Sequence, residues 1–171
     1  LEVINWLAAQ SWCNGKVGMM GLSWGGFNSL QIAELAPEPL KAIITLCSTV
    51  DRYADDIHYK GGCLLNENLG WGSTMWSYSS RPPDPMLVGD AWLNMWSERL
   101  KLEPFLPIKW LEHQTRDDYW KHGSVCENYD GIQSAVLAIG GWGDAYKNAV
   151  SHLVSNIKSP VKGVVGPWVH K

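Results

Sequence analysis

Charged residues are few in this sequence, and acidic and basic residues occur in similar numbers. Lys and Arg number 14 and Asp and Glu number 17, so that charged residues make up only 18% of the 171. No basic stripe is present, which argues against a nucleic-acid partner. No apolar run reaches the about 18 residues that a membrane span needs, so we predict no membrane partner either.

The cysteines lack the spacing of a metal or redox site. The chain has Cys13, Cys47, Cys63 and Cys126. They form no C-x-x-C pair, and no histidine–carboxylate cluster has ligand spacing, so we predict neither a metal nor another cofactor. Free thiols are typical of a reducing compartment, which favours a cytoplasmic location. Because the chain opens on Leu1 inside a helical pattern, we expect a fragment, with any targeting segment upstream.

Four apolar runs predict buried strands, and helical patterns separate them. The strands are expected at Val17–Leu22, 41–49, 134–141 and 161–166. Helical spacing of apolar residues occurs over 1–10, Trp24–Ala36 and Ala145–Ile157. Strands alternating with helices are typical of a parallel sheet covered by helices, so the fold class is predicted as α/β.

Residues 51–133, between the second and third predicted strands, have a different character. Six of the eleven tryptophans fall here, together with the loop "SSRPPDP" and helix-like pieces at Trp92–Leu100 and Pro107–His113. No long apolar β-run appears. We therefore predict a helical cap at 51–133, inserted between two halves of one core, 1–50 and 134–171.

The stretch "VGMMGLSWGGFNSL" places Ser23 between Gly21 and Gly25, directly after a predicted strand and before a predicted helix. A nucleophile elbow has this form, a G-x-S-x-G turn that exposes a serine hydroxyl. The backbone N–H of Trp24 would then be one oxyanion donor, helped by the positive end of the helix dipole. Ser23 as a plain helix N-cap is the alternative.

A serine nucleophile needs an imidazole base and a carboxylate that orients it. In α/β-hydrolases these follow in the order Ser, Asp, His, on loops after later strands. Asp144 lies just past the third predicted strand and His170 just past the fourth. The alternatives are Asp144 as the N-cap of the next helix and His170 as a surface residue. The other histidines lie mid-helix or in the insert, as His58, His113, His122 and His152.

The insert and the later loops supply candidates for substrate contact. Asp55, beside Asp51 and Asp56, could bind a cationic amino group, although caps and solvated first-turn acids are the simpler interpretation of all three. The predicted aromatic contacts are Trp71, Trp76 and Trp142. Trp92 and Trp96 also lie in the insert, but their i, i+4 spacing favours packing on one helix face.

The motifs "WCNGKVGMMGLSWGGF", "GGWGDAY" and "GPWVHK", in this order, resemble the cocaine esterase / X-prolyl dipeptidyl-peptidase (CocE/NonD, peptidase S15-type) group of serine hydrolases. Residues 115–124, "TRDDYWKHGS", resemble the stretch that leads out of the cap in this group. The resemblance covers nearly the whole chain. It implies an α/β-hydrolase fold with a helical cap, and it implies Ser23 as nucleophile, Asp144 as orienter and His170 as base.

Two departures from the group bear on function. The residue after the serine is commonly tyrosine in the group and is Trp24 here, so substrate preference does not carry over. The group also has upstream strands, whose loop supplies a second oxyanion donor, and a C-terminal β-sandwich, and this chain lacks both. The implied reaction is hydrolysis of a small ester, amide or short peptide through an acyl-enzyme. The alternatives are an X-Pro dipeptidyl peptidase, an acyltransferase and a non-catalytic binding scaffold.

Overall fold

The computed structural model describes residues 1–170, which form two compact units. Unit 1 comprises Leu1–Asp56 and the chain from Arg116 onward, and unit 2 comprises Ile57–Thr115. The insert predicted at 51–133 is longer than unit 2, because its first six residues and the stretch 116–133 make their contacts within unit 1.

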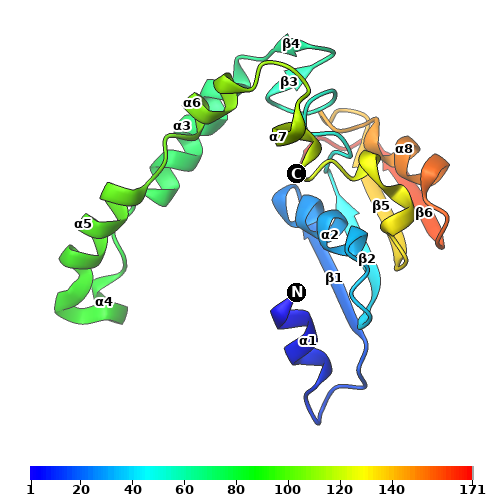
Figure 1. Cartoon of the computed structure of the whole chain (residues 1–171), viewed down its shortest axis with the longest axis horizontal. Coiled ribbons are helices and arrows are strands. Elements are labelled where there is room, and N and C mark those ends of the chain that lie inside the picture. The colour runs from blue at the N-terminus through cyan, green and yellow to red at the C-terminus, as the bar shows by residue number, and fades with distance from the viewer. Residues whose placement is uncertain (171) are drawn as a thin grey trace. The chain divides into compact units, whose positions relative to one another are not determined.

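A four-stranded parallel sheet forms the centre of unit 1 (Figure 1). Its strands lie in the order β1 (Val17–Leu22), β2 (Leu40–Leu46), β5 (Ala135–Gly141) and β6 (Val161–Gly166). All three neighbouring pairs are parallel, which confirms the predicted α/β class. The strands are short and mostly apolar, as is typical of a parallel sheet. Because the strands are parallel, their carboxyl ends share one edge of the sheet.

Helices cover one face of this sheet. The helix α2 (Trp24–Glu34) packs on β1 and β2, and α8 (Ala149–Asn156) packs on β5 and β6 (Figure 1). Their apolar side chains meet those of the strands in the core, where Leu30 and Leu153 are each 1% exposed. A shorter helix, α1 (Glu2–Ala8), precedes β1 and contributes Ile4 to the same core. The helix predicted from Ala145 begins only at Ala149, after a turn.

Within the described residues of unit 1, no helix packs on the opposite face of the sheet. Met20, Leu22 and Val164 point to this face and are 68%, 47% and 43% exposed. The strands β1 and β6 are the two outermost strands of the sheet. The predicted cover of helices is therefore present on one side within residues 1–170.

The segment after unit 2 returns to the sheet through short helical turns. These are α7 (Asp118–Lys121) and two 3-10 turns, Val125–Glu127 and Tyr129–Gly131. The backbone N–H of Cys126 donates to the carbonyl of Val50, and the N–H of Arg52 donates to the Ser124 hydroxyl. These bonds fasten 116–133 to the loop that leaves β2, which explains why this stretch belongs to unit 1.

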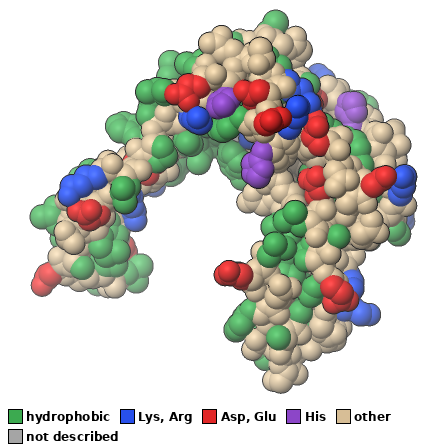
Figure 2. All heavy atoms as spheres, in the orientation of Figure 1, with side chains coloured by type: hydrophobic (Ala, Val, Ile, Leu, Met, Phe, Trp, Pro, Cys, Tyr) green, Lys and Arg blue, Asp and Glu red, His purple; other side chains and the backbone are tan. Residues whose placement is uncertain are grey.

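Unit 2 is helical apart from one small hairpin. It contains β3 (Tyr59–Lys60), β4 (Cys63–Leu64), α3 (Glu67–Ser79), α4 (Pro85–Val88), a 3-10 turn (Gly89–Ala91), α5 (Trp92–Leu102) and α6 (Leu106–Glu112). Hydrophobic side chains cover much of the α4–α5 end of this unit (Figure 2), where Met86 is 90% and Leu87 84% exposed. Within residues 1–170, every helix falls short of the length and apolarity that crossing a bilayer demands.

Candidate active site

Ser23 occupies a strained turn between β1 and α2. Its backbone has φ 54° and ψ −114°, a region that residues with a side chain rarely adopt. Such a conformation costs on the order of 1–3 kcal/mol and persists only where the surroundings fix it. Here the Ser23 N–H donates to the carbonyl of Leu46, and the Ser23 carbonyl accepts from the N–H of Phe27, both at 2.9 Å. The Ser23 side chain makes no capping hydrogen bond, so its hydroxyl is not used as an N-cap.

Glycines allow this turn to be tight. A Cβ added at Gly21 would lie 2.4 Å from the Gly25 Cα, and one added at Gly26 would lie 2.9 Å from the Thr45 hydroxyl oxygen. A Cβ at Gly25 itself would meet nothing within 4 Å. The two glycines of the motif therefore have different roles. Gly21 must lack a side chain, and Gly25 supplies the backbone that closely approaches Gly21.

Replacing Gly21 with Ala is expected to destabilise the full-length protein by about 3 kcal/mol, because the close contact is with rigid backbone. The measurement is the midpoint of thermal unfolding. Gly18→Ala in the same strand is the matched control, since its Cβ would come no nearer than 3.8 Å to the Ala42 carbonyl. Equal midpoints for the two variants would contradict this explanation of the elbow.

Asp144 and His170 meet beyond the carboxyl ends of β5 and β6. Nδ1 of His170 lies 3.0 Å from Oδ1 of Asp144. The Asp144 side chain is 1% exposed, whereas that of His170 is 42% exposed. A buried carboxylate thus holds one ring nitrogen of a solvent-accessible imidazole, which leaves Nε2 as the atom available for proton transfer.

Tyr146 connects this pair to the turn at Ser23. The centroid of its ring lies 5.5 Å from that of His170 and 5.4 Å from that of Phe27. Phe27 lies in the first turn of α2, the helix that begins directly after Ser23. The three predicted triad residues therefore belong to one edge of the sheet. Within residues 1–170 no hydrogen bond joins the Ser23 hydroxyl to His170, and such bonds often tighten only when substrate binds.

Cys47 is a fourth group at this edge, and the sequence analysis missed it. It directly follows β2, with φ 48°, and is 9% exposed. Burial, together with the neighbouring Asp144 carboxylate, raises the pKa of its thiol to about 12. At neutral pH Cys47 is therefore a thiol and not a thiolate nucleophile.

Asp51, one of the acids considered for binding a substrate amine, already has partners within the protein for both of its carboxylate oxygens. Its Oδ1 accepts from the N–H groups of Tyr53 and Ala54, and its Oδ2 pairs with Arg116 at 3.0 Å. Burial disfavours the ionised form, but these hydrogen bonds and the guanidinium outweigh it and lower the pKa of Asp51. Asp51 thus caps a turn, the simpler of the two interpretations.

Asp56 is also paired. Its side chain is fully buried, 3.1 Å from Nε of Arg52, and accepts from the Tyr146 hydroxyl. The Arg52 guanidinium in turn lies over the rings of Trp24 and Phe27. This network was not predicted, although the i, i+4 spacing of Arg52 and Asp56 is a sequence signal for an ion pair.

Asp55, predicted as a substrate contact, is half-buried in the same loop. Its backbone carbonyl accepts from the Thr49 hydroxyl at 2.7 Å. The loop after β2 is thus fixed by hydrogen bonds on both sides of this residue. Its role in substrate contact stays a prediction.

The predicted aromatic contacts fall in different units. Trp142 directly follows β5 in unit 1 and is 65% exposed. Trp71 and Trp76 lie on α3 in unit 2, where Trp76 packs edge-on against Phe105. A substrate role for these three side chains stays a prediction. Trp92 and Trp96, by contrast, stack on each other with centroids 6.1 Å apart, as expected for helix packing.

Of the remaining histidines, His122 and His152 belong to unit 1, and His58 and His113 belong to unit 2. His58 is buried in unit 2, with Nδ1 2.8 Å from Oδ1 of Asn68 and its ring against Trp110. His122 and His152 are exposed.

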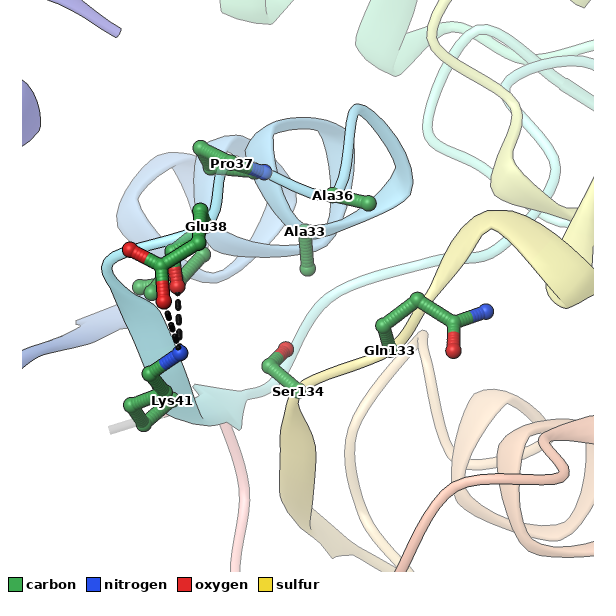
Figure 3. A pocket seen from close by; sticks show the side chains of 8 residues that line it. Ala33, Ala36, Pro37, Glu38, Lys41, Gln133 and Ser134 are labelled. Carbon is green, nitrogen blue, oxygen red and sulfur yellow. Dashed lines mark hydrogen bonds and ion pairs between the residues drawn. The ribbon is translucent and has the colours of Figure 1, made fainter.

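One surface pocket, lined by Ala33, Glu38, Lys41 and Ser134, lies at the end of α2 and the starts of β2 and β5 (Figure 3). That is the amino end of the strands, opposite to Ser23.

Comparison with known proteins relates the chain to one family. A family model described as X-Pro dipeptidyl-peptidase (S15 family) matches residues 1–171. Cocaine esterase of Rhodococcus sp. (strain MB1 Bresler) is 27% identical over 192 residues, covering 99% of this chain and 33% of the esterase. A putative serine esterase of Mycobacterium tuberculosis is 24% identical over 137 residues, covering 78% of this chain and 20% of that protein.

Solved structures share the fold. A CocE/NonD family hydrolase from Staphylococcus aureus matches 96% of this chain and 27% of its own, with a TM-score of 0.74 and 24% identity. An α-amino acid ester hydrolase matches 99% of this chain and 31% of its own, with a TM-score of 0.65 and 21% identity. The chain spans about a third or less of the length of each of these relatives.

Proposed function

We propose that this chain, which belongs to the X-Pro dipeptidyl-peptidase (S15) family, carries the catalytic triad of a serine hydrolase that cleaves acyl esters or amides. Ser23 is the nucleophile, His170 the base and Asp144 its orienter. The observation that carries the proposal is the strained backbone of Ser23 at the same sheet edge as the hydrogen-bonded Asp144–His170 pair. Strain of this kind, outside glycine, is concentrated at functional sites.

The proposed reaction proceeds through an acyl-enzyme. The Ser23 oxygen attacks the carbonyl carbon while its proton passes to Nε2 of His170, because Nδ1 faces Asp144. The first N–H groups of α2 have no partner within the helix, and that of Trp24 donates to the developing oxyanion in this proposal. The imidazolium gives its proton to the leaving group, and water, activated by the same imidazole, then releases the acid.

Charge in the loop after β2 favours substrates without a cationic amino group. Asp51 is paired with Arg116, and Asp56 is buried against Arg52 and Tyr146. Binding an ammonium there would require breaking an existing ion pair, and a buried pair that loses one partner costs several kcal/mol. With Asp51 and Asp56 engaged, a cationic amino group would depend on Asp55 alone, and we therefore favour uncharged acyl groups over the X-Pro dipeptides that the family description names.

The test compares substrate classes on the full-length protein. Nitrophenyl esters of uncharged acyl groups are expected to give a larger kcat/KM than Xaa-Pro-nitroanilides with a free amino terminus. Acetylating that terminus should not abolish whatever turnover the nitroanilides show. A reversed preference would support the dipeptidyl-peptidase instead, and absence of turnover with every ester and amide would overturn the hydrolase proposal.

A further inference from the structure

Three potential metal ligands converge at the proposed active site. One ligand atom each from Cys47, Asp144 and His170 lies within 4.8 Å of the other two. Spacing along the chain does not reveal this cluster, because the three residues are far apart in the sequence and follow the neighbouring strands β2, β5 and β6. They are brought together only by the parallel order of the sheet.

One oxygen atom in this cluster is poorly satisfied. Oδ1 of Asp144 faces His170, whereas Oδ2 is buried without a nitrogen or oxygen donor within residues 1–170, and the Cys47 thiol is the donor beside this carboxylate. The Asp144 side chain is 1% exposed. A thiol is a weak hydrogen-bond donor, and a cation that replaces its proton would satisfy the buried carboxylate better.

We propose that Cys47, Asp144 and His170 form a binding site for a soft divalent cation of the Zn²⁺ class, and that occupation of this site inhibits the enzyme. Thiolate, imidazole and carboxylate are the ligands that such cations take in proteins. The half-exposed His170 leaves room for a water molecule as fourth ligand. A thiol ligand disfavours Mg²⁺ and Ca²⁺, which take oxygen ligands.

Binding exchanges a proton for the metal. The Cys47 S–H bond breaks, the proton leaves to solvent, and a metal–sulfur bond forms as the cation loses water ligands. The backbone on the Cys47 side is fixed, because its N–H donates to the carbonyl of Ile139 at 2.9 Å. His170, whose side chain is 42% exposed, has the freedom to adjust to the cation.

Inhibition rests on the proposed function, whereas binding does not. A cation held between Asp144 and His170 replaces the proton on Nδ1, which passes through water to Nε2. The imidazole then carries its proton on Nε2 and can no longer accept the proton of Ser23. Removal of the cation by a chelator should restore activity in full, since no covalent bond of the protein has changed.

Binding is measured with Co²⁺ as the probe, on the full-length protein, because a thiolate–Co²⁺ bond produces a charge-transfer absorption band in the near ultraviolet. We expect this band in the unmodified protein and in Ser23→Ala. We expect it to be absent in Cys47→Ser and in a second variant, Cys47→Ala. Cys63→Ser is the matched control, because Cys63 is exposed on β4, and it should keep both the band and the basal activity.

Inhibition is measured as the Zn²⁺ concentration that halves ester hydrolysis. Cys47→Ser should raise it at least about tenfold, because loss of a supporting group alone typically costs 10–100-fold in metal affinity. A Co²⁺ band that is missing in the unmodified protein, or that persists in both Cys47 variants, overturns the metal site. A band without any ester hydrolysis would leave the metal site standing while the proposed function fails.

Discussion

Replacing Ser23 with Ala in the full-length protein is expected to lower kcat for acyl esters by on the order of 10⁶-fold, as removal of a serine nucleophile does in other triads. The substitution removes only the hydroxyl group. Ala has the same Cβ as Ser, so the backbone at φ 54° is no more strained than before. The fold and the affinity for substrate should therefore be preserved. Residual activity would come from oxyanion stabilisation and substrate positioning without covalent catalysis.

The matched control for this variant is Ser151→Ala. Ser151 lies on α8, is exposed, and its hydroxyl bonds only to the carbonyl of Asn148 among the described residues. Its removal should leave kcat and the thermal midpoint nearly unchanged. A Ser23→Ala enzyme that is folded and retains more than about a tenth of its kcat would show that Ser23 is not the nucleophile.

Asp144→Asn is expected to lower kcat by about 10⁴-fold with little change in KM. The carboxylate Oδ1 now accepts from Nδ1–H of His170, which leaves Nε2 free to take the Ser23 proton. An amide N–H₂ in that place would donate to Nδ1 and move the ring proton to Nε2, where it blocks the transfer. The change is nearly isosteric, so the effect should be on kcat.

Asp130→Asn is the comparison for Asp144→Asn. Asp130 is exposed and pairs with Lys158 at 2.8 Å, away from the proposed site. Its substitution should leave kcat unchanged, and an exposed pair of this kind contributes about 1 kcal/mol at most to stability. Asp144→Asn with a kcat within tenfold of the unmodified protein would remove Asp144 from the triad.

The sheet could be predicted because each strand carries its own local signal. The run from Val17 to Leu22 is uniformly apolar, is preceded by a turn and ends at a serine, and β1 has the same bounds. Strand β6 likewise coincides with the prediction at 161–166. Strands of parallel sheets leave such signals because they carry apolar residues on both faces.

Unit 2 was harder to predict, since its helices carry weaker signals. The helix α3 (Glu67–Ser79) contains Gly70 and Gly72, and glycine disfavours a helix by about 1 kcal/mol. Gly72 is needed there, because a Cβ would lie 2.2 Å from a ring carbon of Pro107. The hairpin of β3 and β4 was missed as well, although Gly61-Gly62, both with positive φ, is a recognised turn signal.

At the site, Cys47 was missed because the strand predicted at 41–49 includes it. In the structure β2 ends at Leu46, which leaves Cys47 just past the strand, as Asp144 and His170 are just past β5 and β6. Other features could not be read from spacing. The contacts of Tyr146 with Phe27 and His170 depend on how α2 and the loop after β5 pack, which no local pattern encodes.

The central claim is that the Ser23 hydroxyl is activated by His170. Its most direct test is labelling of the full-length protein with a fluorophosphonate, followed by peptide mapping in a mass spectrometer. We expect one phosphonyl group per chain, on Ser23, and greatly slowed labelling in His170→Ala. A label on another residue, or equal labelling of Ser23→Ala and the unmodified protein, would contradict it.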